Sequence, residues 1–312
     1  MIGTDIRTAH AAVDGTPPRS PEKRKVHFRM RPWKIVAEVF MASCAILWLL
    51  PVLFALYVSL RPITETNKLG YVSLPKTLTL QNYIEAWQQS NIWGYFVNSV
   101  LITLPGVLIT LFFASGVAFV ITRINIKLNI LLLMIFTAGN LLPQQVIITP
   151  LYRLYLAIPL PEFLSSSGSM YNSIFGLIVI NVIFQVGFCV FVLSNYMRTI
   201  PQEMYEAALV DGASLWTRYW NLTLPTIRPA LAALATLLTT WIYNDFFWAI
   251  TLISTGKNRP ITSALTDLQG EFVANQNMIA AAALMAAIPT IIIFFLLQKQ
   301  FIAGLTLGST KG

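Results

Sequence analysis

Six long apolar runs constrain this chain more than any other feature of its sequence. Each can cross about 30 Å of hydrocarbon, which takes roughly 20 helical residues, and they occupy residues 35–60, 95–121, 128–147, 174–195, 230–253 and 278–297. An open strand edge would leave backbone groups unpaired in lipid, and the alternating pattern of a barrel is lacking, so we expect helices. Only 11% of the residues are charged, against about 25% in ordinary soluble domains. The sequence therefore predicts an all-α membrane protein with six transmembrane helices.

Prolines interrupt several of these runs. Pro51, Pro105, Pro143 and Pro289 each remove a backbone donor and bend a helix. Such a bend is tolerated in lipid where neighbouring helices or a polar cavity cover it. We therefore expect kinked helices around a cavity.

The distribution of Lys and Arg sets the orientation. If both termini lie in the cytoplasm, most of the 21 basic residues fall on the cytoplasmic side, as the positive-inside rule requires. Many of them belong to residues 1–33, a proline-containing tail without an apolar period that we expect to be disordered. The net charge of +8 is concentrated beside the first run, which fits an anionic lipid leaflet better than nucleic acid. We expect the membrane domain at residues 34–301 and a cytoplasmic tail at residues 302–312.

A polar segment at residues 199–226 separates the fourth run from the fifth. Pro201 suits the first position of a helix, and Glu203 lies in the first turn, where the helix dipole favours a negative charge. Gly212 can adopt the left-handed conformation that ends a helix. These signals predict one short helix and a tight turn on the cytoplasmic side.

A second short helix is expected after this turn. Ser214 is a suitable N-cap for a helix over residues 215–220. Pro225 and Pro229 are expected to end that helix and to restart the chain as the fifth span. The whole segment is thus predicted to be a helix-turn-helix beneath the membrane.

The same segment carries a recognisable pattern. Glu206-Ala207-Ala208, Gly212 and Leu222-Thr223-Leu224-Pro225, at this spacing, resemble the EAA loop of ATP-binding-cassette importer permeases. The usual residue at position 222 is Ile, and Leu preserves an apolar contact of similar volume. The alternative is an amphipathic hairpin that only connects two spans.

Other motifs are similar to the carbohydrate branch of this family, typified by the smaller maltose-type permease subunit. In chain order they are Ser59-Leu60-Arg61-Pro62, Leu78-Thr79-Leu80-Gln81-Asn82-Tyr83, Asn98-Ser99, Pro143-Gln144-Gln145, Pro150-Leu151-Tyr152, Asn244-Asp245-Phe246-Phe247-Trp248, and Gly304-Leu305-Thr306 with Gly308 and Lys311-Gly312. Each motif is weak alone, but together and in this order they are specific. Only the first 33 residues fall outside the resemblance.

The resemblance implies the type I importer permease fold in a bacterial inner membrane. It also implies a second homologous permease subunit, two ATP-binding-cassette ATPase subunits that carry Mg-ATP, and an extracytoplasmic sugar-binding protein. The residues that it assigns to ATPase coupling are Glu203, Glu206, Ala207, Ala208, Asp211, Gly212, Leu222, Leu224 and Pro225. The tail residues expected to reach between the ATPases are Gly304, Leu305, Thr306, Gly308 and Lys311, for which a frayed end without function is the alternative.

Polar residues within the apolar runs indicate a pathway. They are costly when they face lipid and are expected to face a cavity or one another. The candidates for the translocation pathway are Asn140, Gln144, Gln145, Asn181, Gln185, Asn244, Asp245 and Trp248. Hydrogen bonding between helices is the alternative role for each of them.

Several motifs of catalytic sites are missing. The chain has no P-loop pattern, no H-E-x-x-H and no serine elbow, and Cys44 and Cys189 lack metal-ligand spacing. We therefore expect no catalytic, metal or cofactor site on this chain, and ATP hydrolysis on partner subunits.

The leading hypothesis is the permease subunit of an ATP-driven, binding-protein-dependent carbohydrate importer, forming half of the translocation pathway. The alternatives are an importer permease for polyamines or phosphate, a stand-alone secondary carrier and a membrane enzyme. A stand-alone carrier would not need a docking loop, and the sequence shows no evident internal repeat.

Overall fold

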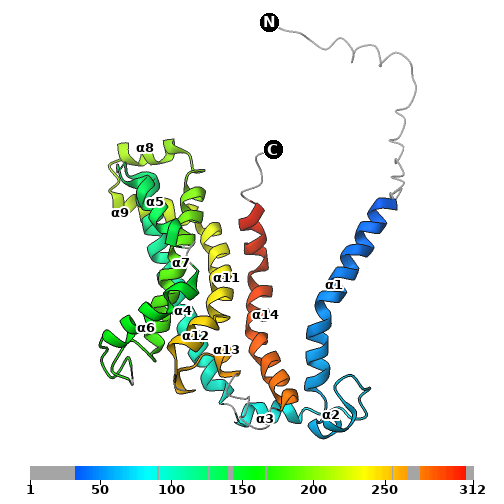
Figure 1. The fold of residues 1–312 in the computed structure, drawn as a ribbon. Helices are drawn as coiled ribbons and strands as arrows, with labels where there is room; N and C mark the ends of the chain where they lie inside the picture. Colours follow the sequence, from blue (N-terminus) through cyan, green and yellow to red (C-terminus); the bar gives the residue numbers. More distant parts are fainter. Residues whose placement is uncertain are drawn as a thin grey trace, which may run out of the picture. The chain divides into compact units, whose positions relative to one another are not determined.

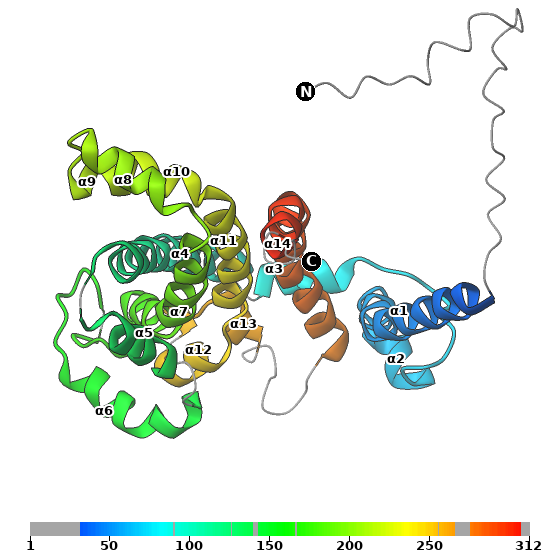
Figure 2. The same cartoon turned by 90° about the horizontal axis from the view of Figure 1, so that it is seen from above.

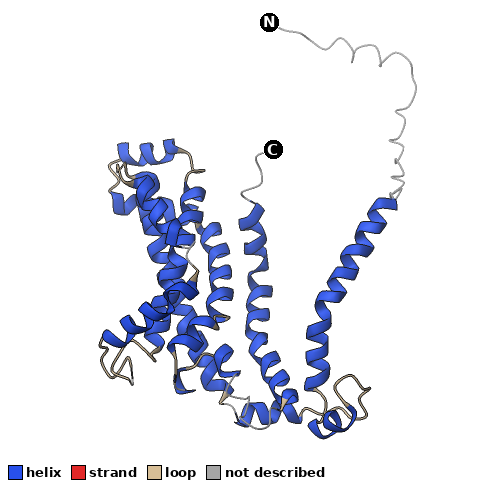
Figure 3. Cartoon of the chain, viewed as in Figure 1, coloured by secondary structure: helices blue, strands red, loops and turns tan. Residues whose placement is uncertain are grey.

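The computed structural model describes residues 32–89, 91–125, 127–139, 143–165, 167–254, 256–265 and 275–306. These residues form helices joined by loops, and none of them belongs to a strand (Figure 3). Pro159 and Ser169 form one isolated β-bridge. The prediction of an all-α protein is confirmed.

Within the described ranges, five helices have at least 16 residues. They are α1 (Pro32–Ser59), α4 (Ile92–Arg123), α7 (Ile174–Met197), α11 (Arg228–Tyr243) and α14 (Gln276–Thr306). In the described part of the chain, α1, α4, α7 and α14 are long and apolar enough to cross a membrane. A fifth span results if α11 is joined to residues 215–226, from which it is bent by 70°. The number of six spans stays a prediction.

Shorter helices connect these elements. They are α2 (Ile63–Leu69), α3 (Gln81–Gln89), α5 (Asn129–Ala138), α6 (Ile148–Ala157), α8 (Gln202–Val210), α9 (Leu215–Thr217), α10 (Leu224–Thr226), α12 (Phe247–Leu252) and α13 (Ile261–Ala264). Two 3₁₀ turns cover Gln144–Ile147 and Gly256–Asn258, and a π turn covers Arg218–Thr223.

The chain divides into two compact units, residues 1–51 and 52–312. In the larger unit α4 packs against α7 and α11, α5 packs against α7, and α11 also packs against α14 (Figure 2). Its core combines aromatic side chains such as Trp248 with aliphatic ones, among them the fully buried Leu177, Val190, Leu193 and Leu238. Within this unit α8 and α9 lie at one end of α4, α7 and α11, and α3, α12 and α13 lie at the other (Figure 1).

The third apolar run does not form one helix, so the expectation of a continuous span over residues 128–147 is wrong. Helix α5 ends at Ala138, and Pro143 stands in an extended conformation before the 3₁₀ turn that leads into α6. Proline lacks an N–H, and the residue before it disfavours helical geometry, which explains the break. Pro51, Pro105 and Pro289, by contrast, lie inside α1, α4 and α14.

The fifth run is also interrupted, and a single helix over residues 230–253 is likewise wrong. Helix α11 ends at Tyr243, where the Asn244 side chain donates back to the Thr240 carbonyl over 2.8 Å. The Asp245 carboxylate then accepts from the Trp248 backbone N–H over 3.1 Å and so caps α12. Short polar side chains compete in this way with the helical backbone, so the pair ends one helix and begins another.

The loop after α12 is fastened to α4. The Asn98 side chain donates to the carbonyls of Lys257 and Arg259 over 2.8 and 3.0 Å. The Ser99 hydroxyl accepts from the Ile261 N–H over 2.9 Å. The Asn98-Ser99 motif therefore fixes the position of α13.

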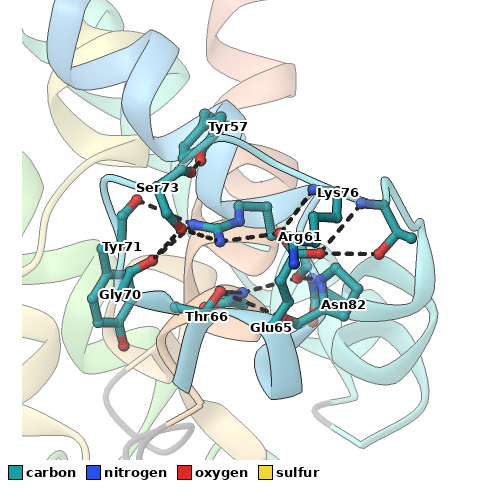
Figure 4. Close-up of polar contacts among 12 residues, drawn as sticks. Tyr57, Arg61, Glu65, Thr66, Gly70, Tyr71, Ser73, Lys76 and Asn82 are labelled. Carbon is teal, nitrogen blue, oxygen red and sulfur yellow. Dashed lines mark hydrogen bonds and ion pairs between the residues drawn. The ribbon is translucent and has the colours of Figure 1, made fainter. Parts of the chain in front are cut away.

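A buried arginine organises the loop that follows α1. Arg61 is fully buried, and its guanidinium donates to the carbonyls of Gly70 and Tyr71, to Ser73 Oγ over 2.8 Å and to Glu65 Oε1 over 3.2 Å (Figure 4). A charge taken out of water requires such a set of acceptors. The loop is therefore folded around the Arg61 side chain.

Two asparagines tie this loop to distant helices. Asn82 of α3 donates to the carbonyls of Ser59 and Arg61 over 2.8 and 2.7 Å. Asn277 of α14 donates to the Arg61 carbonyl over 2.8 Å and to Thr66 Oγ1 over 2.9 Å. We call Arg61, Glu65, Thr66, Ser73, Asn82 and Asn277 the Arg61 cluster, and it joins two of the sequence motifs to the start of α14.

Candidate functional site

Residues 202–226 form a helical hairpin, here called the inner hairpin. Helix α8 begins after Pro201, which is extended and stands just before the helix instead of at its first position. Gly212 makes the turn with φ +78°, a value that suits glycine, and its N–H donates to the Leu209 carbonyl over 3.0 Å. Ser214 Oγ accepts from the Thr217 N–H and caps the second arm. The expected left-handed glycine and serine cap are both present.

The second arm runs further than expected. Pro225 does not end it, because the π turn passes directly into α10, where Pro225 occupies an initial position that needs no backbone donor. The chain turns instead at Ile227, which is fully buried, and α11 departs at 70°. The hairpin thus ends in a sharp elbow.

Buried aromatic and polar side chains hold the inner hairpin on the bundle. Tyr205 is the buried residue of α8, and its hydroxyl lies 3.1 Å from Thr223 Oγ1 on the other arm. The guanidinium of Arg123, the last residue of α4, lies 3.9 Å from the centre of the Tyr205 ring. Arg123 also donates to the Ile200 carbonyl over 3.1 Å and to Gln202 Oε1 over 3.2 Å. These contacts bind both arms to the end of α4.

A second anchor lies in the other arm. Tyr219 is buried in the π turn, its hydroxyl lies 2.8 Å from Ser115 Oγ of α4, and its ring packs against Phe119. None of these anchors was expected from the sequence. Arg123 lies at the end of an apolar run, where a basic residue ordinarily contacts lipid headgroups, so its position did not indicate a contact with the hairpin. The remaining signal in the sequence was the two tyrosines, which are buried beside polar partners.

The residues assigned to coupling divide into two groups. The exposed group consists of Glu203, Glu206, Ala207, Asp211, Gly212 and Pro225. The half-buried group consists of Ala208, Leu222 and Leu224, of which the two leucines pack against the main core. One group therefore forms a surface, and the other attaches that surface to the bundle.

A polar cavity of about 320 Å³ lies between α7, α11, α12 and the 3₁₀ turn of residues 144–147. Its lining residues are Gln144, Asn181, Phe184, Gln185, Thr240, Trp241, Asn244, Asp245 and Trp248. Six of the eight pathway candidates meet here. Gln145 is exposed and does not line the cavity, and Asn140 lies outside the described residues.

The cavity wall is organised by Asp245. One carboxylate oxygen accepts from Asn181 Nδ2 of α7 over 3.1 Å, and the other accepts from the Trp248 N–H. The Trp248 ring is 1% exposed and packs 5.1 Å from the Phe184 ring, centre to centre. The break between α11 and α12 thus brings two of the pathway candidates, Asp245 and Trp248, against α7.

The remaining candidates lie at the chain end. Gly304, Leu305 and Thr306 are the last residues of α14, which runs past the expected boundary at residue 301. Gly308 and Lys311 lie outside the described residues. In the described part of the chain no three His, Cys, Asp or Glu residues are grouped as metal ligands would be, and Cys44 and Cys189 are not bonded to each other.

Comparison with known proteins identifies the family. Residues 106–306 match the sequence profile of the binding-protein-dependent transport system inner membrane component. The chain belongs to this family. The predicted resemblance to importer permeases is thereby confirmed, and the chain is a membrane transport component.

Two relatives show how far the likeness of this permease extends. It is 31% identical over 239 residues to the melibiose/raffinose/stachyose import permease protein MelC of Bacillus subtilis, covering 76% of this chain and 83% of that protein. It is 30% identical over 290 residues to the probable starch degradation products transport system permease protein AmyC of Thermoanaerobacterium thermosulfurigenes, covering 92% and 99%.

A solved structure shares the fold of this permease. The crystal structure of a bacterial ABC transporter involved in the import of the acidic polysaccharide alginate aligns with a TM-score of 0.72 at 22% identity, covering 92% of this chain and all of that chain. A second structure of a bacterial alginate ABC transporter, in complex with its alginate pentasaccharide-bound periplasmic protein, aligns with a TM-score of 0.62. The predicted importer-permease fold is confirmed.

Proposed function

We propose that this permease is one membrane subunit of an ATP-driven, binding-protein-dependent carbohydrate importer. It forms half of the translocation pathway with a second homologous permease subunit. Two ATPase subunits carrying Mg-ATP bind its inner hairpin, and an extracytoplasmic sugar-binding protein delivers the substrate. The observation that carries the proposal is one compact unit with an exposed hairpin at one end of its long helices and a polar cavity between them.

The surface of the inner hairpin supports the ATPase contact. Helix α8 exposes Glu203 and Glu206 beside small Ala207, and Val210 at its end is 88% exposed. Carboxylates form strong charge-assisted hydrogen bonds with basic groups, and exposed apolar residues beside them are typical of contact sites between proteins. A hairpin that served only as a connection would need neither.

The arrangement of the larger unit supports the proposed orientation. The final turns of α14 lie at the same end of the unit as α8 (Figure 1). If the hairpin faces the cytoplasm, where ATPase subunits are found, the C-terminal residues face it too. We propose a multi-pass protein of the bacterial inner membrane with both termini in the cytoplasm.

The substrate class rests on the relatives and on the cavity. MelC and AmyC are named for transport of melibiose, raffinose and stachyose and of starch degradation products. The cavity offers amide side chains and aromatic rings, which suit the hydroxyls and the apolar faces of sugars. Among the residues that the structure describes, no Lys, Arg or His lines it to receive a phosphate.

The test uses the complex assembled with its ATPase and binding-protein partners in proteoliposomes. ATP-dependent uptake of a sugar is expected for the wild-type complex and is expected to be lost in Glu206→Lys, because the new cation repels a basic docking site. Copurification of the ATPase should weaken in the same variant. Glu162→Lys, at an exposed carboxylate far from the hairpin in sequence, is the matched control and should transport normally. Transport without ATP, or normal coupling in Glu206→Lys, would contradict the proposal.

A further inference from the structure

Among the described residues, the cavity contains one acidic side chain, that of Asp245, without a basic partner. Of its nine lining residues within the described part of the chain, Asp245 is the one with an acidic or basic side chain. In the described part of the chain no Lys or Arg forms an ion pair with its carboxylate, whose partners are the neutral Asn181 side chain and the backbone N–H groups of Phe247 and Trp248. A carboxylate in this position, when ionised, has no cation beside it to cancel its field.

The wall also carries a donor without an acceptor. The indole Nε1 of Trp248 is buried and donates to no group within the described residues. Buried N–H groups are ordinarily satisfied, so this unpaired one distinguishes the Trp248 side chain from the rest of the cavity wall. Trp241 lines the same cavity and is 41% exposed, so part of its surface is accessible.

Size and chemistry limit what fits. At about 320 Å³ the cavity is near the lower end of the range for ligand sites, which is roughly 300–1,000 Å³. The amides of Gln144, Gln185 and Asn244 can each donate and accept, as sugar hydroxyls do. A sugar unit with an apolar ring face and uncharged hydroxyls matches these groups.

We propose that this cavity is a subsite for uncharged sugar units and that Asp245 excludes anionic ones, such as uronic acids and sugar phosphates. The inference rests on the proposed function and extends it by naming the charge class of the substrate. A ligand carboxylate would enter beside the Asp245 carboxylate with no cation in the lining to balance it. Like charges held close together in such a site are strongly disfavoured.

The test compares two substrates in the assembled complex in proteoliposomes. One is a neutral oligosaccharide that the wild-type complex takes up, and the other is its derivative with one primary hydroxyl oxidised to a carboxylate. The derivative is chosen so that the binding protein binds both, as measured by calorimetry. The readout is the ratio of anionic to neutral uptake, and comparison of this ratio between variants cancels the contribution of the binding protein.

The wild-type ratio is expected to be low. Asp245→Asn should raise it by about tenfold, which corresponds to about 1.4 kcal/mol, whereas Asp245→Glu should keep it low. Gln185→Lys leaves the bond between Asp245 and Asn181 untouched and should also raise the ratio, which keeps the test valid if Asp245→Asn fails to fold. Glu162→Gln removes an exposed carboxylate outside the cavity and should change nothing.

Two failures can be distinguished. If the wild-type complex imports the neutral sugar but the ratio is the same in Asp245→Asn or, where that variant does not fold, in Gln185→Lys, the charge selectivity is refuted and the importer remains. If the wild-type complex shows no ATP-dependent uptake of any sugar, the proposed function itself fails, and the subsite fails with it.

Discussion

The inner hairpin and the Arg61 cluster occupy opposite ends of the larger unit. Their charged groups differ, because those of the hairpin are exposed and that of Arg61 is buried. The hairpin exposes the carboxylates of Glu203 and Glu206 and leaves them without partners from its own arm. In the Arg61 cluster the guanidinium is fully buried and donates to four groups. The difference indicates that the charge at one end is bound mainly by groups of the same chain, whereas the carboxylates at the other end are free for the proposed contact with an ATPase subunit.

The largest expected effect concerns the turn of the hairpin. Gly212→Pro replaces a residue at φ +78° by one restricted to about −65° and removes the N–H that bonds to Leu209. The two arms should lose their fixed angle, so ATP-dependent uptake should fall to background. Because residue 212 is exposed, the helix bundle should remain folded. Uptake in proteoliposomes and thermal unfolding in detergent measure the two effects.

Gly212→Asn is the control, because asparagine tolerates the left-handed region. It should retain most of the uptake. If Gly212→Pro transports normally, the angle of the hairpin has no role in transport. The proposal that the hairpin end acts in transport, unlike the Arg61 end, would then be contradicted.

The next effect concerns the buried arginine. Arg61→Ala removes the guanidinium donors of Glu65, Ser73 and two carbonyls, and removing one partner of a buried charged network costs about 3 kcal/mol or more. The free energy of unfolding should fall accordingly, with no direct effect on ATPase binding. Arg61→Lys should recover only part of the stability, because an ammonium cannot reproduce the planar set of donors. A stability equal to wild type in Arg61→Ala would show that the cluster does not hold this end together.

A smaller effect is expected for the hairpin anchor. Tyr205→Phe and Thr223→Val each remove one side of the hydroxyl contact and should each cost about 1 kcal/mol. If the contact is the cause, the double variant should cost clearly less than the sum of the two single variants. Thermal unfolding of the four proteins measures the coupling, and full additivity would exclude the bond as an anchor.

The smallest effect depends on pH. Hydrogen bonds from the Lys76 N–H, and then from Arg61 and Thr77, hold the pKa of Glu65 below its usual value of 4.5. A lowered pKa in the folded state means that the carboxylate stabilises the cluster above pH 4.5 and that this contribution is lost as the pH falls through the lowered value. Limited proteolysis between residues 61 and 82 should increase in that acidic range. The increase should be absent in Glu65→Gln, which is expected to be equally sensitive at all pH values.

Features that depend on residues close together in the chain were predicted better from the sequence than features that depend on contacts between distant residues. The long apolar runs gave α4, α7 and α14, and the turn residues Gly212 and Ser214 are where the pattern placed them. The break at Asn244 is an exception: its cause is local, but the surrounding apolar run concealed the competition between side chain and backbone. The Arg123–Tyr205 contact was missed because its partners are far apart in the chain.

The candidate cavity shows the same limit. The cost of polar groups in lipid was sufficient to select six residues that line one cavity, although their sequence positions span about a hundred residues. The same criterion could not exclude Gln145, which neighbours Gln144 but points elsewhere. Which of two adjacent polar residues turns inward depends on the helix break at Pro143.

The elbow at Ile227 has a mechanical consequence for the permease. The 16 residues of α11 span about 24 Å at the usual rise of 1.5 Å per residue, with the elbow at one end and Asn244 immediately beyond the other. A rotation of about 10° at the elbow would therefore displace the Asn244 end by about 4 Å. If an ATPase subunit moves the hairpin as proposed, a lever of this length would convert a small rotation at Ile227 into a change in the shape of the polar cavity beside Asn244.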